Sequence, residues 1–177
     1  MKLLIFDTED TDLWQNTLVA LDKQPEIFDW YGLTLDTETL EVVNELQVFA
    51  KPKGKIAEGA ARVTKKCDSD FANYDPFSVN ALAIKAYIEE HDAVLGHNAM
   101  FDWGITNFEM QRCGLTVNWP VLIDSVEKSE WIHGYRLTLT ALYEFLFGEK
   151  FKEVHTAKAD VVALKDCWVE MIKRGWV

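Results

Sequence analysis

Long apolar runs are absent from this sequence of 177 residues. None approaches the roughly 20 residues that a bilayer-spanning helix needs, so we expect no membrane span. The apolar N-terminal run meets an acid at Asp7, too soon for a signal peptide. Both absences favour a cytoplasmic location.

Cysteine is scarce, and Cys67, Cys113 and Cys167 have no zinc-site spacing. An odd number argues against a disulfide framework, so we expect buried, reduced thiols. No stretch is rich in proline, glycine or serine, and no internal repeat divides the chain. With 49% hydrophobic residues, the sequence predicts a single packed domain over residues 1–177.

Basic residues are too few to balance the acids, and the formal net charge is −11. Such a chain should bind long duplexes poorly through charge alone, although bound metal ions could neutralise carboxylates at a nuclease site. Only residues 51–66 are basic. Their cations are Lys51, Lys53, Lys55, Arg62, Lys65 and Lys66. A strip that contacts phosphates and a solvated charged loop both remain open interpretations.

The hydrophobic pattern predicts an α/β fold. Strands are expected at residues 2–7, 27–35, 40–49, 93–96 and 121–123. Helices are expected at residues 77–90, 101–112, 138–147 and 158–173. Residues 36–39 predict a hairpin turn, and residues 51–75 an irregular excursion. A strand meander followed by alternating helices and strands predicts a mixed sheet, antiparallel and then parallel, with helices flanking it.

Acidic residues follow the first predicted strand. Asp7 and Glu9 are two residues apart at its end, so both side chains should leave the same face. Two such carboxylates repel each other unless a cation binds between them. A solvated strand end with an acidic turn is the alternative, because Asp10 and Asp12 follow directly.

A second polar segment, His97-Asn98-x-x-Phe101-Asp102, follows another predicted strand. Open α/β sheets bind ligands at that position. Asp102 should lie in the first turn of the next helix, where it could instead complement the helix dipole. His97 and Asn98 could likewise be capping and turn residues.

A third segment contains His155 and Asp160, five residues apart. On one helix they would point about 140° apart. They can serve one site only if His155 lies in the loop before the helix and Asp160 in its opening turns. A surface histidine before an amphipathic helix is the alternative.

Gathered together, Asp7, Glu9, Asp102 and Asp160 would carry too much negative charge without cations. Hard oxygen ligands of this kind select Mg²⁺ or Mn²⁺ rather than zinc. A neighbouring histidine supplies a base that works near neutral pH. These residue types are those of two-metal phosphodiester hydrolysis.

In order and spacing, the three segments resemble the DEDD superfamily of 3′-5′ exonucleases, related to the proofreading subunit of bacterial replicative polymerase. A histidine five residues before the last aspartate resembles the histidine-type (DEDDh) branch, whereas the tyrosine-type branch needs Tyr where this chain has Thr156. Weaker similarity covers most of the chain. Asp10, Asp12 and Ser125 depart from the usual pattern, which bears on the choice of substrate.

The resemblance implies an RNase H-like fold with two divalent ions. Asp7 would bridge both ions, Glu9 and Asp160 would complete the first site, and Asp102 would support the second. His155 would deprotonate or orient the attacking water.

The same resemblance implies contacts to substrate. The backbone around Thr8 and Glu9 would hold the 3′-terminal nucleotide, and Leu13 or Trp14 could stack on its base. We also expect substrate contacts near three residues of the second segment. They are His97, Asn98 and Phe101.

We therefore expect a metal-dependent 3′-5′ exonuclease that releases 5′-mononucleotides, most favourably from single-stranded DNA or frayed DNA ends. A 3′ exoribonuclease is the alternative, and a non-catalytic nucleic-acid-binding subunit is a more distant one. A haloacid dehalogenase-type phosphatase is disfavoured because it needs Asp where this chain has Glu9. A protein partner in replication or repair fits this function, and the oligomeric state is left open.

Overall fold

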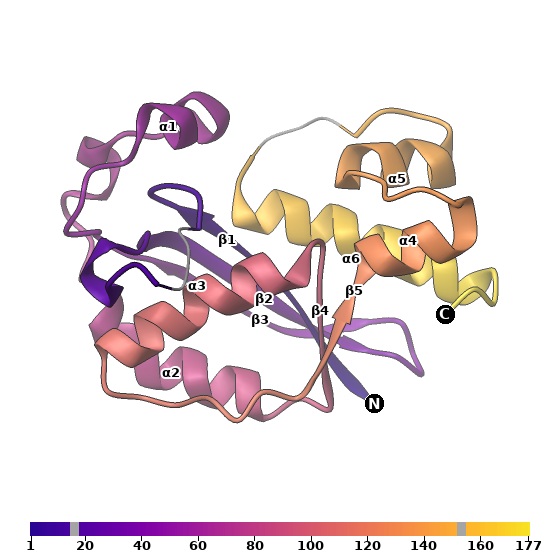
Figure 1. Cartoon of the computed structure of the whole chain (residues 1–177). Coiled ribbons are helices and arrows are strands. Elements are labelled where there is room, and N and C mark those ends of the chain that lie inside the picture. The colour runs from indigo at the N-terminus through magenta and orange to yellow at the C-terminus, as the bar shows by residue number, and fades with distance from the viewer. Residues whose placement is uncertain (15–17, 152–154) are drawn as a thin grey trace.

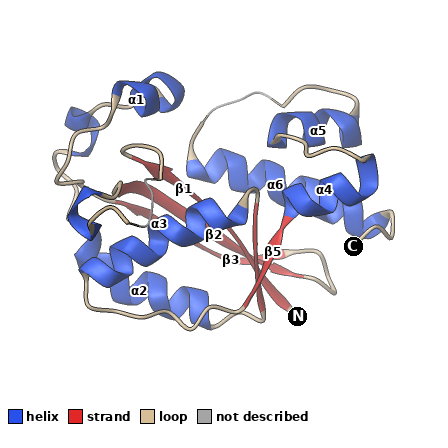
Figure 2. Cartoon of the chain, in the orientation of Figure 1, coloured by secondary structure: helices blue, strands red, loops and turns tan. Residues whose placement is uncertain are grey.

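A computed structural model describes residues 1–14, 18–151 and 155–177 of the chain. Within this part, five strands form one sheet in the order β3-β2-β1-β4-β5 (Figure 2). The strands are β1 (Lys2–Asp10), β2 (Ile27–Asp36), β3 (Val42–Phe49), β4 (Ala93–Gly96) and β5 (Val121–Asp124). β1 pairs antiparallel with β2, and β2 with β3, whereas β4 runs parallel to both β1 and β5. The predicted mixed sheet is confirmed.

Helices cover both faces of this sheet (Figure 1). They are α1 (Glu58–Thr64), α2 (Phe77–Glu89), α3 (Ala99–Arg112), α4 (Ser125–His133), α5 (Leu139–Phe147) and α6 (Ala157–Lys173). α2 and α3 pack on one face, and α5 and α6 pack on the other. α1 lies apart from the others, beyond the end of β1 (Figure 1).

The first half of β1 is buried on both faces. Leu3 and Ile5 belong to the core beneath α5 and α6, and Leu4 and Phe6 to the core beneath α2 and α3. All four side chains are inaccessible to solvent. Central strands covered on both sides read as continuous apolar runs, which explains the N-terminal sequence. β1 is therefore fixed in the middle of the molecule, and its polar second half begins at Asp7.

The structure differs from the predicted elements at β1, α1 and α4. β1 continues to Asp10, because Thr8 and Glu9 still pair with β2. α1 lies inside the expected excursion of residues 51–75, where Gly59 and neighbouring alanines give little periodic signal. α4 was not predicted, since its sequence is mostly polar, but the Asp124 side chain caps it by accepting a hydrogen bond from Val126 N at 2.9 Å.

All three cysteines are free. Cys167 is buried and Cys113 half-buried, but Cys67 is exposed, so the expectation of burial is wrong there. In the described ranges, no helix has both the length and the apolar character needed to cross a bilayer.

The turn from β4 into α3 is tight. A Cβ on Gly96 would lie 2.9 Å from both Cα and Cβ of Ala99, the first residue of α3. Asn98 between them has a left-handed backbone, with φ of 65°. Gly96 therefore lets α3 begin directly at the strand end.

We expect Gly96→Ala to lower the free energy of unfolding by about 1–3 kcal/mol, because the new methyl must displace backbone. Gly59→Ala is the matched control, since a Cβ there meets no atom within 4 Å. The control should be neutral or slightly stabilising. Urea unfolding of both variants checks this, and equal midpoints would contradict the steric account.

Candidate active site

Three carboxylates meet where β1 passes the first turn of α6. Asp7 and Glu9 leave the same face of β1, as predicted, and Asp160 approaches from α6. One oxygen of each lies within 4.8 Å of the others. The structure thus gathers acids separated by about 150 residues of sequence.

Asp102 reaches this cluster from the opposite face of β1. It is buried in the first turn of α3, as predicted. Its Oδ1 accepts hydrogen bonds from Thr8 N at 2.9 Å and from Thr8 Oγ1 at 2.8 Å. Thr8 therefore joins α3 to the strand that carries Asp7 and Glu9.

Burial and mutual repulsion raise the pKa values of these acids. Burial raises the pKa of Asp7 well above its usual range, and Asp102 and Glu9 add to the shift. Burial, followed by repulsion from Asp160, raises the pKa of Glu9 to about 8. Burial raises the pKa of Asp102 to about 7 against the hydrogen bonds from Thr8.

This donor set fits divalent cations. The gathered ligands are carboxylate oxygens, which suit Mg²⁺ and Mn²⁺. Charged carboxylates this close and this buried need positive compensation. Asp7, Glu9 and Asp160 are placed to hold a metal ion, with Asp102 next to them.

His155 precedes α6, outside the helix. It comes one residue before Thr156, whose Oγ1 caps α6 by accepting a hydrogen bond from Ala159 N at 3.2 Å. The backbone at His155 is left-handed, with φ of 35°, and the side chain is half-buried. The five-residue spacing to Asp160 therefore has the geometry that one shared site requires.

His97 and Asn98 connect the ends of the parallel strands. His97 Nδ1 lies 2.8 Å from Ser125 Oγ, and its ring also bonds the backbone of Leu137. Burial lowers the pKa of His97, which favours the neutral ring. Asn98 N donates to Asp124 Oδ1 at 3.0 Å. Both residues thus have partners within the protein.

A cavity of about 410 Å³ opens beside the acids, between β1, α1 and the start of α3. Its lining is mainly apolar, with acids at one side. It consists of Thr8, Glu9, Asp10, Asp12, Leu13, Gly59, Ala60, Val63, Thr64 and Phe101. Three of the predicted substrate contacts, Thr8, Leu13 and Phe101, therefore share one cavity. We call it the terminal cavity.

Trp14 is packed against α3 instead. Its ring fills the space over Gly104, where a Cβ would come within 2.8 Å of it. The ring also meets Phe108 edge-on, with centroids 5.8 Å apart. Leu13, by contrast, is 72% exposed.

Two acids near the cluster were missed from the sequence as site residues. Asp10 is buried; its Oδ2 accepts from Thr8 Oγ1 at 2.9 Å, and its Oδ1 has no partner among the described residues. Asp29 is buried on β2 directly opposite Glu9. It accepts from Gln47 Nε2 at 3.2 Å and from the backbone of Ala157. A lone acid within the apolar run of β2 was the signal that could have identified Asp29.

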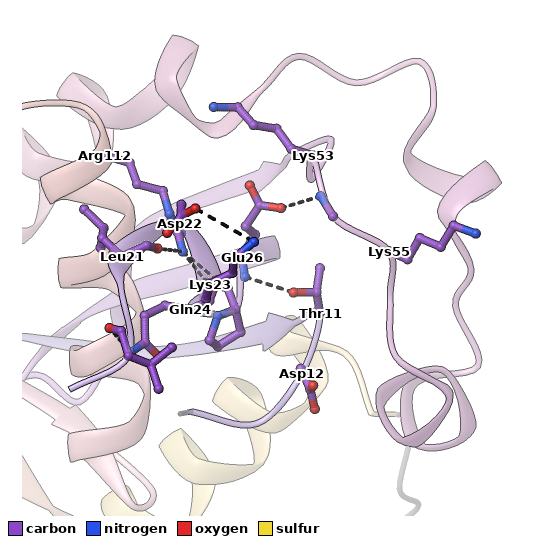
Figure 3. A pocket seen from close by; sticks show the side chains of 13 residues that line it. Thr11, Asp12, Leu21, Asp22, Lys23, Gln24, Glu26, Lys53, Lys55 and Arg112 are labelled. Atoms are coloured by element: carbon purple, nitrogen blue, oxygen red, sulfur yellow. Dashed lines mark hydrogen bonds and ion pairs between the residues drawn. The ribbon is translucent and has the colours of Figure 1, made fainter. Parts of the chain in front are cut away.

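A larger cavity, about 1000 Å³, lies away from the cluster acids, and none of them lines it (Figure 3). Arg112 Nη2 donates there to the carbonyls of Leu21 and Gln24, at 2.9 and 2.6 Å. The guanidinium thus holds the loop after β1. Lys53 and Lys55 extend from the facing loop, so part of the basic window borders this cavity (Figure 3).

Comparison with known proteins agrees with this geometry. Residues 4–166 match the RNase T exonuclease family, and the chain belongs to that family. A DNA polymerase III of PolC type from Listeria monocytogenes is 23% identical over 124 residues, and the corresponding protein of Listeria welshimeri matches equally. The match covers 67% of this chain but only 8% of those polymerases.

Solved structures show the same fold. The nuclease domain of 3′hExo, a DEDDh family member bound to rAMP, has a TM-score of 0.79 at 16% identity and covers 98% of this chain and 92% of that one. A 3′-exonuclease solved in a study of histone mRNA stem-loop recognition has a TM-score of 0.78 at 17% identity, with 98% and 82% covered. The predicted exonuclease family is confirmed by the family match, and the chain shares the predicted fold with a nuclease domain of the DEDDh family.

Without divalent ions, we expect the protein to lose thermal stability as pH rises from 5.5 to 8.5. Folded Glu9 keeps its proton up to about pH 8, whereas the unfolded chain releases it near about pH 4. The folded state binds more protons between these values, so unfolding becomes easier as pH rises. The melting temperature should fall by roughly 3–10 °C.

Thermal melts in EDTA across this range check the expectation. Glu9→Gln is the matched control, because the amide cannot titrate, and it should flatten the curve. A melting temperature that rises with pH in the parent would show that the pKa values of the acids are not raised as described.

Proposed function

We propose that this exonuclease removes 5′-mononucleotides from the 3′ ends of single-stranded or frayed DNA, using two Mg²⁺ or Mn²⁺ ions. The carboxylate oxygens of Asp7, Glu9 and Asp160 within 4.8 Å of one another are the observation that carries this function. Similarity to bacterial DNA polymerases supports DNA. RNA is the second candidate, because one similar structure is bound to rAMP and another concerns a histone mRNA stem-loop.

Each acid has a distinct place in this proposal. Asp7 would contact both ions. The charges of Glu9, Asp102 and Asp160 all raise its pKa. Glu9 and Asp160 would complete the first site, and Asp102 would support the second. When bound, the ions stabilise the charge that develops at the phosphate and lower the pKa of the attacking water.

His155 would accept the proton of that water. It lies directly ahead of α6, the helix that carries Asp160. The water oxygen bonds to phosphorus, the bond to the 3′ oxygen of the preceding nucleotide breaks, and that oxygen takes up a proton. The phosphate remains on the 5′ oxygen of the released nucleotide.

The terminal cavity would hold the last nucleoside. Leu13, Val63 and Phe101 offer apolar contact to a base, which any base can accept. We assign the base contact to Leu13 rather than Trp14, because Trp14 is packed on α3. Among the residues that the structure describes, no lysine or arginine lines this cavity, whereas Asp10 and Asp12 do. A 3′-hydroxyl end should therefore bind better than a 3′-phosphate.

A binding subunit without turnover is less well supported, because the sequence keeps all four acids and His155, and three of the acids lie close together. A partner in replication or repair and a cytoplasmic location remain predictions.

The test is a panel of 5′-labelled DNA and RNA oligomers, single- and double-stranded, sampled over time. We expect single-nucleotide shortening and 5′-mononucleotides with Mn²⁺ or Mg²⁺, and none with Ca²⁺ or EDTA. Calcium's looser coordination should misplace the water. A 3′-phosphate should slow the reaction about tenfold or more, because repulsion of about 1.4 kcal/mol between this phosphate and the acids of the terminal cavity is enough for a tenfold change in rate.

Asp7→Ala should abolish hydrolysis in the same assay without unfolding the protein. Asp22→Ala, which changes an exposed acid outside the cluster, is the control and should match the parent. Internal cleavage, nucleoside 3′-phosphates or full activity in EDTA would contradict the proposed chemistry.

We also expect substitutions of His155 and His97 to have different effects, the first on activity and the second on stability. His155→Ala should lower kcat on the order of 10²-fold, the scale of a positioned base, with an unchanged melting temperature. His97→Ala should lower the melting temperature, because it leaves Ser125 and Leu137 without their ring partner. Inactive but fully stable His97→Ala, beside active His155→Ala, would reverse the two roles.

A further inference from the structure

A second hollow near the acid cluster is lined by residues of β2, β3 and the start of α6. Its volume is about 430 Å³. It is lined by Asp29, Gln47, Phe49, Lys66, Phe151, Thr156, Lys158, Ala159 and Val162. We propose that this hollow, the upstream subsite, holds the nucleotide that precedes the scissile phosphate. This inference rests on the proposed exonuclease function.

The acid cluster borders both hollows, because Glu9 lines the terminal cavity and sequence or strand neighbours of Glu9 and Asp160 line the upstream subsite. The terminal cavity is built from β1, α1 and the start of α3, and the upstream subsite from β2, β3 and the first turns of α6. Asp29 in the upstream subsite pairs with Glu9 of the cluster across β1 and β2. Ala159 in the same hollow adjoins Asp160. A strand that enters both hollows therefore carries its linking phosphate over the acids.

The two hollows differ in charge as these occupants require. The described lining of the terminal cavity contains no lysine or arginine and suits a nucleoside that carries no further phosphate. The upstream subsite contains Lys66 and Lys158. A nucleotide inside the strand brings its own 5′ phosphate, to which one of these cations can bind.

Phe49 and Phe151 add ring surface to the upstream subsite. Aromatic rings combined with cations bind single strands with little sequence preference, because every base has a face that can stack. The volume is also in the range of small-ligand sites, about 300–1000 Å³.

Lys66 is the cation that we assign to the phosphate. It lines the hollow together with Asp29, the residue that pairs with Glu9 of the cluster. Lys158 is committed elsewhere, since it pairs with Glu45 at 3.3 Å and lies 5.1 Å from the centre of the Tyr31 ring. Lys66 follows α1, whose Val63 and Thr64 line the terminal cavity. One short segment therefore borders both hollows.

The experiment compares two substrates. One is a single-stranded DNA oligomer, and the other is the p-nitrophenyl ester of thymidine 5′-monophosphate, in which p-nitrophenol replaces the upstream nucleotide. The readout is the ratio of kcat/KM for the oligomer to kcat/KM for the ester. Lys66→Ala, Lys66→Glu and Phe49→Ala are compared with the parent, each after a thermal melt.

We expect Lys66→Ala and Phe49→Ala to lower this ratio about fivefold or more, mainly through KM, which is the scale of losing one stacked base or phosphate contact. Lys66→Glu should lower it further. Lys66→Ala should also reduce the slope of log(kcat/KM) against log[salt] by about 0.7 for the oligomer. Phe49 packs against Phe71 and Tyr74, so Phe49→Leu replaces it if Phe49→Ala unfolds.

Exposed residues outside both hollows are the matched controls. Lys128→Ala on α4 and Tyr135→Ala after it should keep the parental ratio. A ratio and salt slope that neither Lys66 variant changes would overturn the upstream subsite alone. A parent that hydrolyses neither substrate would overturn the proposed function, and the subsite with it.

Discussion

Repulsion among carboxylates at the end of β1 is the constraint on which the site depends. The apolar half of β1 is buried on both faces, so the polar half cannot move away from its neighbours. α6 brings Asp160 to one face of the strand, and α3 holds Asp102 against the other through Thr8. The fold thus keeps together carboxyl groups that either hold protons or, once ionised, need bound cations.

Patterns that act over a few residues were readable from the sequence. Side chains alternate in direction along a strand, which puts Asp7 and Glu9 on one face of β1, and His155 was expected in the loop before the helix that carries Asp160. Both expectations depend on local geometry, and both agree with the structure. α4 has no strong apolar period and was missed. Asp29 comes close to the cluster because β2 pairs with β1. Trp14 is packed in the protein because its ring covers Gly104 of α3. A lone acid in an apolar run marks Asp29 as unusual, but its contact with the cluster joins residues far apart in the sequence and follows no local spacing.

Charge distribution accounts for how an acidic chain can act on a polyanion. The net charge of −11 argues against a broad nucleic-acid surface. The acids of the cluster could instead hold metal ions, and Lys66 and Lys158 line one hollow next to it. The basic window is divided, because Lys66 borders the cluster side whereas Lys53 and Lys55 border the larger cavity. Recognition limited to the last nucleotides of a strand suits this arrangement.

The central claim is that the buried acids are a cation site. Isothermal titration of Mn²⁺ into the metal-free protein at pH 7, repeated in buffers with different ionisation enthalpies, tests it most directly. We predict binding accompanied by release of about one proton or more, because carboxyl groups with raised pKa values must lose their protons to coordinate metal. Absence of binding, or binding without proton release, would contradict the account.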